Sequence, residues 1–265
     1  MLCVVVLSEL LLSGCGAVPL TGRRQILLVS DQEIFQAGLV QYKEYLGTAT
    51  LSSDASATAV VKNVGRKLAD ATESYLRANG FESELSNFAW EFNLVKDTQV
   101  NAFCMPGGKI VVYEGLLSVA KTEAELAVVL GHEIAHAVAK HSNERMSQQI
   151  LAQYGMAILS SALSEKSAIV RETATTVFGL GAQVGMMLPY SRKHEYEADY
   201  MGIVFMEIAG YDSNCAVEFW SKMAALGESS VPEFLSTHPS DSKRIANLQG
   251  KISDAKTVAQ SVRFR

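Results

Sequence analysis

The feature that most constrains the fold is a pair of histidines in the most apolar helix that the sequence predicts. Residues 126–138 (LAVVLGHEIAHAV) are apolar except for His132, Glu133 and His136. A helix that is apolar nearly all round is buried, and each buried polar group without a partner costs about 1–3 kcal/mol. The fold must therefore bring partners for these three side chains into the interior.

The spacing of the two histidines indicates a metal site. Residues four apart lie one turn above each other on one helical face, so His132 and His136 can bind one ion at about 2.0–2.1 Å. Zinc fits this pattern, and we expect one Zn²⁺ per chain. Glu133 is offset around the helix and is expected to take a proton from water as general base. For the motif taken alone, two core histidines without chemistry remain the alternative.

A later acidic motif offers a third ligand. Glu195 and Asp199 share one face of the helix predicted over 191–209. Because a catalytic zinc takes three protein ligands and keeps one position open, we expect Glu195 to bind the metal. We expect Asp199 to hold the outer nitrogen of a ligand histidine. In isolation, the two carboxylates would also fit a solvated helix face.

Two further histidines are assigned away from the metal. His141 lies five residues beyond His136, about 140° further round a continuous helix, so we expect it at the surface or at the helix end. His194 adjoins Glu195 and is expected to face away from the ion.

His238 and Arg244 flank a predicted helix start at Ser240. Attack of an activated water on a carbonyl builds negative charge on its oxygen, and we expect both side chains to stabilise that charge. The alternatives are a loop histidine and a surface arginine. His238 could also be a metal ligand that occupies the open position in a resting enzyme.

The amino end is predicted to be a targeting segment. The apolar run of residues 2–12 is too short to cross a membrane and is typical of a signal peptide. It leads to Cys15 through small residues, a pattern that resembles the bacterial lipoprotein signal. This resemblance implies a signal peptide over 1–14, lipid attachment at Cys15 and a tether over 15–30.

The rest, residues 31–265, is expected to form one domain. A run of strands followed by many helices predicts an α+β fold that is mostly helical, with a small antiparallel sheet. Strands are predicted over 90–95, 100–104 and 109–113. Helices are predicted over 31–46, 55–79, 122–141, 144–163, 166–188, 191–209, 215–226 and 240–249. Glycines in the stretch 163–189 would allow it to cover a cleft.

Charge and cysteine content narrow the partners. The chain has 23 basic and 28 acidic residues, for a net charge of −5, and lacks the basic stripe of a nucleic-acid-binding protein. Cys104 and Cys215 are the cysteines of the predicted domain, and their pairing is left open.

Taken together, these motifs resemble a known family. The two histidines and Glu133, the Glu195–Asp199 pair, Asn101-Ala102-Phe103, Pro106-Gly107-Gly108 and His238-Pro239-Ser240 are similar to zinc peptidases related to HtpX and the CAAX prenyl endopeptidase. The most similar branch is that of periplasmic lipoprotein peptidases such as BepA. The resemblance implies a gluzincin fold, a zinc endopeptidase and a cleft strand that carries Asn101 and accepts an extended peptide.

The resemblance also implies a setting. It places the protein in the envelope of a Gram-negative bacterium, anchored by lipid, acting on misfolded or misassembled envelope proteins. The alternative function is a lipoprotein chaperone with a structural zinc. An intact Glu133 favours the enzyme, because a structural site has no use for a base.

Overall fold

The computed structural model describes residues 15–154, 191–227, 233–238 and 242–263. The signal peptide expected over 1–14, the helix expected over 166–188 and the cover expected from 163–189 lie outside these residues. Within the described part of the chain, no helix combines the length and the apolar character needed to cross a membrane.

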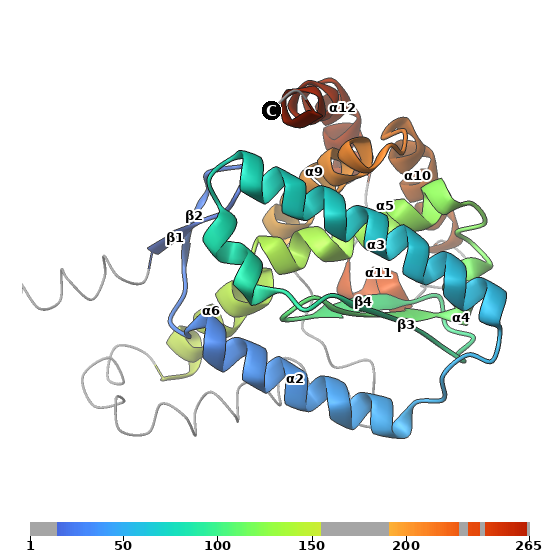
Figure 1. The fold of residues 1–265 in the computed structure, drawn as a ribbon, viewed down its shortest axis with the longest axis horizontal. Coiled ribbons are helices and arrows are strands. Elements are labelled where there is room, and N and C mark those ends of the chain that lie inside the picture. Colours follow the sequence, from blue (N-terminus) through green and yellow to red (C-terminus); the bar gives the residue numbers. More distant parts are fainter. Residues whose placement is uncertain (1–14, 155–190, 228–232, 239–241, 264–265) are drawn as a thin grey trace, which may run out of the picture.

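Helices make up most of the described chain, so the expected α+β fold rich in helix is confirmed at this level (Figure 1). They are α2 (Asp31–Thr48), α3 (Ala55–Ala78), η1 (Glu82–Asn87), α4 (Glu114–Leu117), α5 (Glu123–Val138), α6 (His141–Tyr154), α9 (Arg192–Ala209), α10 (Asn214–Gly227), α11 (Glu233–Thr237) and α12 (Ser242–Arg263). The last helix passes its predicted end at residue 249, because buried Leu248, Ala255 and Ala259 continue its packed face beyond Gly250.

The three predicted strands form one sheet, in the order β3 (Glu91–Val95), β5 (Lys109–Tyr113), β4 (Ala102–Met105). β4 and β5 are antiparallel and are joined by a turn in which Gly107 and Gly108 have φ of 86° and 77°. These positive values favour glycine.

The expectation of a purely antiparallel sheet was wrong, because β3 is parallel to β5. The connection over residues 96–101 passes the end of β5, where the amide of Gly115 donates to the carbonyl of Asp97. β3 therefore pairs with the far side of β5 and leaves β4 at the edge of the sheet.

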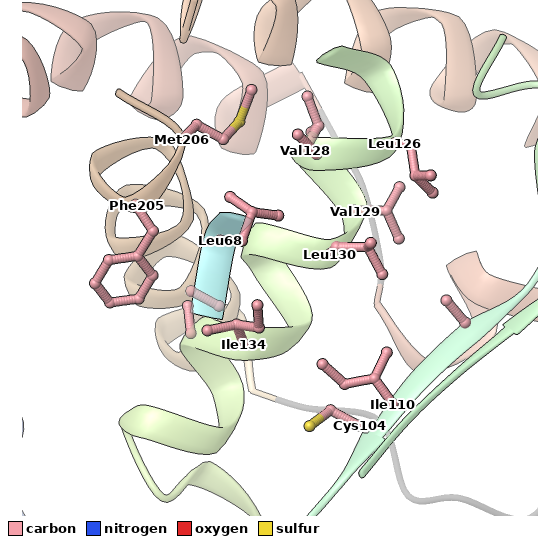
Figure 2. Packing of buried hydrophobic residues seen from close by; sticks show 14 of the residues in the cluster. Leu68, Cys104, Ile110, Leu126, Val128, Val129, Leu130, Ile134, Phe205 and Met206 are labelled. Atoms are coloured by element: carbon pink, nitrogen blue, oxygen red, sulfur yellow. The ribbon is translucent and has the colours of Figure 1, made fainter. Parts of the chain in front are cut away.

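The sheet is covered on both faces. Along β5, Ile110 and Val112 pack into the larger core with α3, α5 and α9, while Val111 and Tyr113 pack against α2 and α6. Figure 2 shows Leu130 and Ile134 of α5 among the larger core's side chains. The helix that carries the two histidines is thus enclosed by the sheet on one side and by helices on the other (Figure 1).

α5 and α9 approach each other at a pair of glycines. A Cβ atom built on Gly131 would lie 3.0 Å from the carbonyl oxygen of Gly202, and one on Gly202 would lie 3.0 Å from the amide nitrogen of His132. These distances are shorter than most Cβ atoms adopt, so a side chain at either position would push its neighbour away. The two glycines therefore let the helix of the histidines lie directly against the helix of Glu195.

The segment expected to be a tether carries a small hairpin. β1 (Cys15–Ala17) pairs antiparallel with β2 (Arg24–Ile26), and the loop between them places Val18 in the core. Its Arg23 forms ion pairs with Glu144 of α6 and Glu197 of α9. Part of this segment therefore lies against the domain.

Candidate metal centre

Four side chains from three parts of the chain meet in the interior. His132 and His136 come from α5, Glu195 from the first turn of α9, and His238 from the residue after α11. Each offers one ligand atom, and these atoms all lie within 4.8 Å of one another. The two predicted histidines and the predicted glutamate are therefore brought together, with His238 as a fourth donor.

The helix starts determine which way these side chains point. Thr122 accepts a hydrogen bond from the amide of Glu125, whose carboxylate accepts from the amide of Thr122, so a capping box begins α5. Ser191 caps α9 in a similar way, by accepting from the amide of His194. Both helices thus begin at defined residues, which sets the rotation of the ligands toward each other.

The distances in this cluster match a tetrahedral metal site. Nε2 of His132 lies 3.0 Å from Nε2 of His136 and 3.3 Å from Nδ1 of His238. Oε1 of Glu195 lies 3.4 Å from Nε2 of His136 and 3.1 Å from Nδ1 of His238. Ligand atoms about 2.0–2.1 Å from one zinc ion are roughly 3.3–3.4 Å apart in a tetrahedron. The cluster can therefore hold one metal ion of this size.

Glu133 lies beside the cluster and outside it. Its Oε1 is buried, makes no hydrogen bond among the described residues, and lies 3.4 Å from Nε2 of His238. The backbone amide of Cys104 on β4 donates to the same carboxylate. Burial raises the pKa of Glu133, which makes the carboxylate a stronger base. The side chain is placed to exchange a proton in the space beside the metal position.

Asp199 lies where its predicted role requires it, beside a ligand histidine. Its Oδ1 lies 3.0 Å from Nδ1 of His132, so the carboxylate can hold the outer nitrogen of that histidine. Burial lowers the pKa of His132, but the opposite effect of its contacts with Asp199 and Glu195 is larger and raises the pKa to about 9.

Arg244 is fully buried and faces the carboxylates. Its Nε and Nη2 donate to Asp199 at 2.6 and 2.8 Å, and its Nη1 lies 2.8 Å from Oε2 of Glu195. The guanidinium also lies over the ring of Trp220, 4.4 Å from its centroid. Its donors are directed at residues of the site, so the geometry favours a supporting role over the predicted contact with a substrate.

Of the two positions expected for His141, the surface was wrong, whereas the residue does lie at a helix end, as the first residue of α6. α5 ends at Val138, and Lys140 has a positive φ of 56° before α6 begins. This break turns the chain, so the angle of a continuous helix does not apply. His141 is completely buried, with its Nδ1 2.9 Å from Nδ1 of His136. His194 stacks on it, with ring centroids 4.3 Å apart.

Asn101 and Cys104 belong to the edge-strand region, whereas Cys215 lies on a helix. Asn101 is buried and immediately precedes the edge strand β4, where its carbonyl accepts from the amide of Tyr113. Cys104 on β4 and Cys215 on α10 are both free thiols. The pairing left open by the sequence is therefore not formed.

A family comparison decides the class of the chain. The model of peptidase family M48 matches residues 61–252, which include the two histidines, Glu133, Glu195, Asp199 and His238. The chain belongs to peptidase family M48. The expected membership of a metallopeptidase family is confirmed.

Several curated proteins resemble this M48 chain. Mitochondrial metalloendopeptidase OMA1 of Arabidopsis thaliana is 40% identical over 63% of this chain and 33% of the relative. The protein of that name from Schizosaccharomyces pombe is 38% identical over 65% and 50%. The beta-barrel assembly-enhancing protease of Yersinia pestis is 31% identical over 63% and 35%. The chain spans between a third and a half of these relatives.

These relatives correct one expectation and support another only at a coarser level. The location in a Gram-negative envelope was wrong, because the M48 relatives of 40% and 38% identity are mitochondrial enzymes. The comparison supports membership of family M48 as a whole and does not support the finer assignment to the HtpX-related branch. The signal peptide and the lipid at Cys15 remain predictions.

Proposed function

We propose that this M48 chain is a zinc-dependent endopeptidase with the gluzincin fold. The observation that carries the proposal is the buried cluster of His132, His136, Glu195 and His238 at zinc-ligand spacing, with the base candidate Glu133 beside it. A structural site would have no use for such a carboxylate. The relatives named as a metalloendopeptidase and as a protease support the same reaction.

Zinc would be held by His132, His136 and Glu195 and would supply a Lewis acid that polarises the peptide carbonyl and acidifies water. Glu133 accepts the proton of the attacking water and returns it to the leaving amine. Asp199 and Arg244 keep the ligands in position, through the outer nitrogen of His132 and through Oε2 of Glu195. The apolar walls of α5 keep bulk water away from these charges.

His238 has a place in two stages of this reaction. In the present arrangement, its Nδ1 lies with the three ligands and would fill the fourth position of a tetrahedron. With zinc bound, this position would have to be left open for water or substrate, because a catalytic zinc needs an open position. A His238 ring that left the metal position could instead donate to the developing oxyanion, which is the role that the sequence predicts.

The substrate is proposed to be an extended polypeptide that adds along β4. This strand is at the sheet edge and has no strand partner on its outer side among the described residues. It begins after Asn101 and passes Glu133, whose carboxylate accepts from the amide of Cys104. A peptide on this edge would present its backbone, and not one particular side chain, to the site. Unfolded or misassembled proteins offer such segments.

The experiment is a cleavage assay on unfolded casein with the purified chain. We expect fragments with zinc present, none after chelation, and recovery when zinc is restored. A Glu133→Gln variant is the matched control, because it keeps the size of the side chain. If aggregation of casein is suppressed equally by both proteins and no fragments form, the chain is a chaperone and the proposal is wrong.

A further inference from the structure

The outer nitrogen of His136 is directed toward the amino-terminal hairpin through two other side chains. Nδ1 of His136 lies 2.9 Å from Nδ1 of His141, and Nε2 of His141 lies 2.9 Å from Oε2 of Glu197. Glu197 in turn accepts from Nε of Arg23 at 2.7 Å and from the hydroxyl of Thr21. The chain of contacts thus runs from a metal ligand to the loop of residues 18–23.

One proton assignment makes both histidine contacts hydrogen bonds. If His136 faces the metal with Nε2, its Nδ1 carries the proton and donates to Nδ1 of His141. His141 then carries its proton on Nε2 and donates it to Glu197. The opposite tautomer of His141 would set two N–H groups against each other. The carboxylate of Glu197 therefore determines the tautomer of His141, and His141 determines the orientation of His136.

At the hairpin end of this path, Arg23 is held by a second carboxylate. Arg23 forms a bidentate pair with Glu144, with Nη1 and Nη2 at 2.9 and 2.7 Å from the two carboxylate oxygens. His194 adds a contact of 3.0 Å from its Nε2 to Glu144. Since His141, Glu144 and Glu197 are all buried, water does not compete strongly for these hydrogen bonds.

We propose that Arg23, Glu197 and His141 are positioning residues that hold the metal ligand His136 from outside the site. The proposal rests on the proposed function in one respect, that the site binds zinc. It adds that the amino-terminal hairpin, which lies outside the family match, sets the affinity of the site for metal. No contact between these three residues and the substrate is required.

The two ligand histidines are then supported from opposite ends of the chain. His132 is held by Asp199 and through it by Arg244 of the last helix. His136 is held by the path that ends at Arg23. The hairpin would therefore act on the metal without contributing a ligand.

The test compares Arg23→Gln with Arg24→Gln, which removes the same charge from the neighbouring, exposed residue. Zinc affinity is measured by competition with a chelator, and the visible spectrum is recorded after cobalt substitution. Partners of ligand histidines are worth about 10–100-fold in metal affinity. We expect a loss near the upper end of this range for His141→Phe, a smaller loss for Glu197→Gln, and a several-fold loss for Arg23→Gln. The cobalt bands should shift in all three variants and stay in place in Arg24→Gln.

Two results separate this proposal from the proposed function. If the parent chain binds no zinc, the proposed function fails. If the parent binds zinc, and Arg23→Gln equals Arg24→Gln in affinity and in cobalt spectrum, only the positioning role is overturned. Should Arg23→Gln fail to fold, Thr21→Val removes a single hydroxyl contact to Glu197. An unchanged affinity and spectrum in that variant would then overturn the proposal.

Discussion

Nδ1 of His132 and Oδ1 of Asp199 lie 3.0 Å apart, although 67 residues separate them in the sequence. The contact joins α5 to α9 and fixes the imidazole so that Nε2 faces the other ligands. An Asp199→Asn variant keeps the size but removes the charge. We expect its zinc affinity to fall about 10–100-fold, measured by chelator competition. An affinity equal to that of the parent would remove Asp199 from the support of the site.

Glu133→Gln should keep zinc and lose peptidase activity. An amide cannot accept the proton of the attacking water, and the loss of a general base costs about 10²–10⁴-fold in rate. Metal analysis and casein cleavage are measured on the same sample. Parental turnover in this variant would mean that another group is the base.

Glu195→Ala should lose zinc far more severely than Glu197→Ala. The first removes a predicted ligand, whereas the second removes only a support of His136. Glu207→Ala on the same helix is the control, because Glu207 is outside the ligand cluster. Equal zinc content in the Glu195 and Glu207 variants would show that the third ligand is misassigned.

His238→Ala should retain zinc through the three other ligands and lose about a hundredfold to a thousandfold in turnover. Zinc content, thermal stability and casein cleavage are compared with the parent. If turnover rises instead, His238 only blocks the open position and takes no part in stabilising the oxyanion.

Acid should loosen the contact between the hairpin and the domain. Burial raises the pKa of Glu144, but the opposite effect of its contacts with His194 and Arg23 is larger and lowers the pKa to about 2. Because this folded-state pKa is depressed, the contribution to stability is present above the unfolded value of about 4.3 and is lost as pH falls toward 2. Urea unfolding from pH 6 to pH 3 should show a smaller loss for Glu144→Gln than for the parent. Identical pH profiles would contradict the assignment.

Periodicity and turn residues in the sequence predict those parts of the structure that depend on neighbouring residues. The helix of the two histidines, the glutamate of α9 and the strands around Gly107 follow from periodicity and turn chemistry, and the structure has them close to their predicted bounds. The three predicted ligands meet because each lies on the apolar face of a helix that has to be buried.

Long-range pairing does not follow from the same signals. The burial of His141 was not predicted, because the chain turns at Lys140 and no glycine or proline in the sequence marks the positive φ there. Arg23 and Glu197 form a hydrogen bond although 174 positions separate them in the sequence. Nothing in the sequence distinguishes either residue from an ordinary charged residue at the surface. The parallel pairing of β3 likewise depends on how a connection crosses the sheet.

The close approach of Gly131 and Gly202 sets the distance between the helix that bears the histidines and the helix that bears Glu195. A methyl group at either position would force the two backbones apart by a few tenths of an ångström. The donor atoms would then separate with them and enclose a wider space. Metal selectivity in proteins depends on such geometry more than on raw affinity. The close crossing at Gly131 and Gly202 therefore limits the radius of the ion that the donor atoms can surround. We expect alanine at either position to shift the preference of the site toward larger ions such as Cd²⁺.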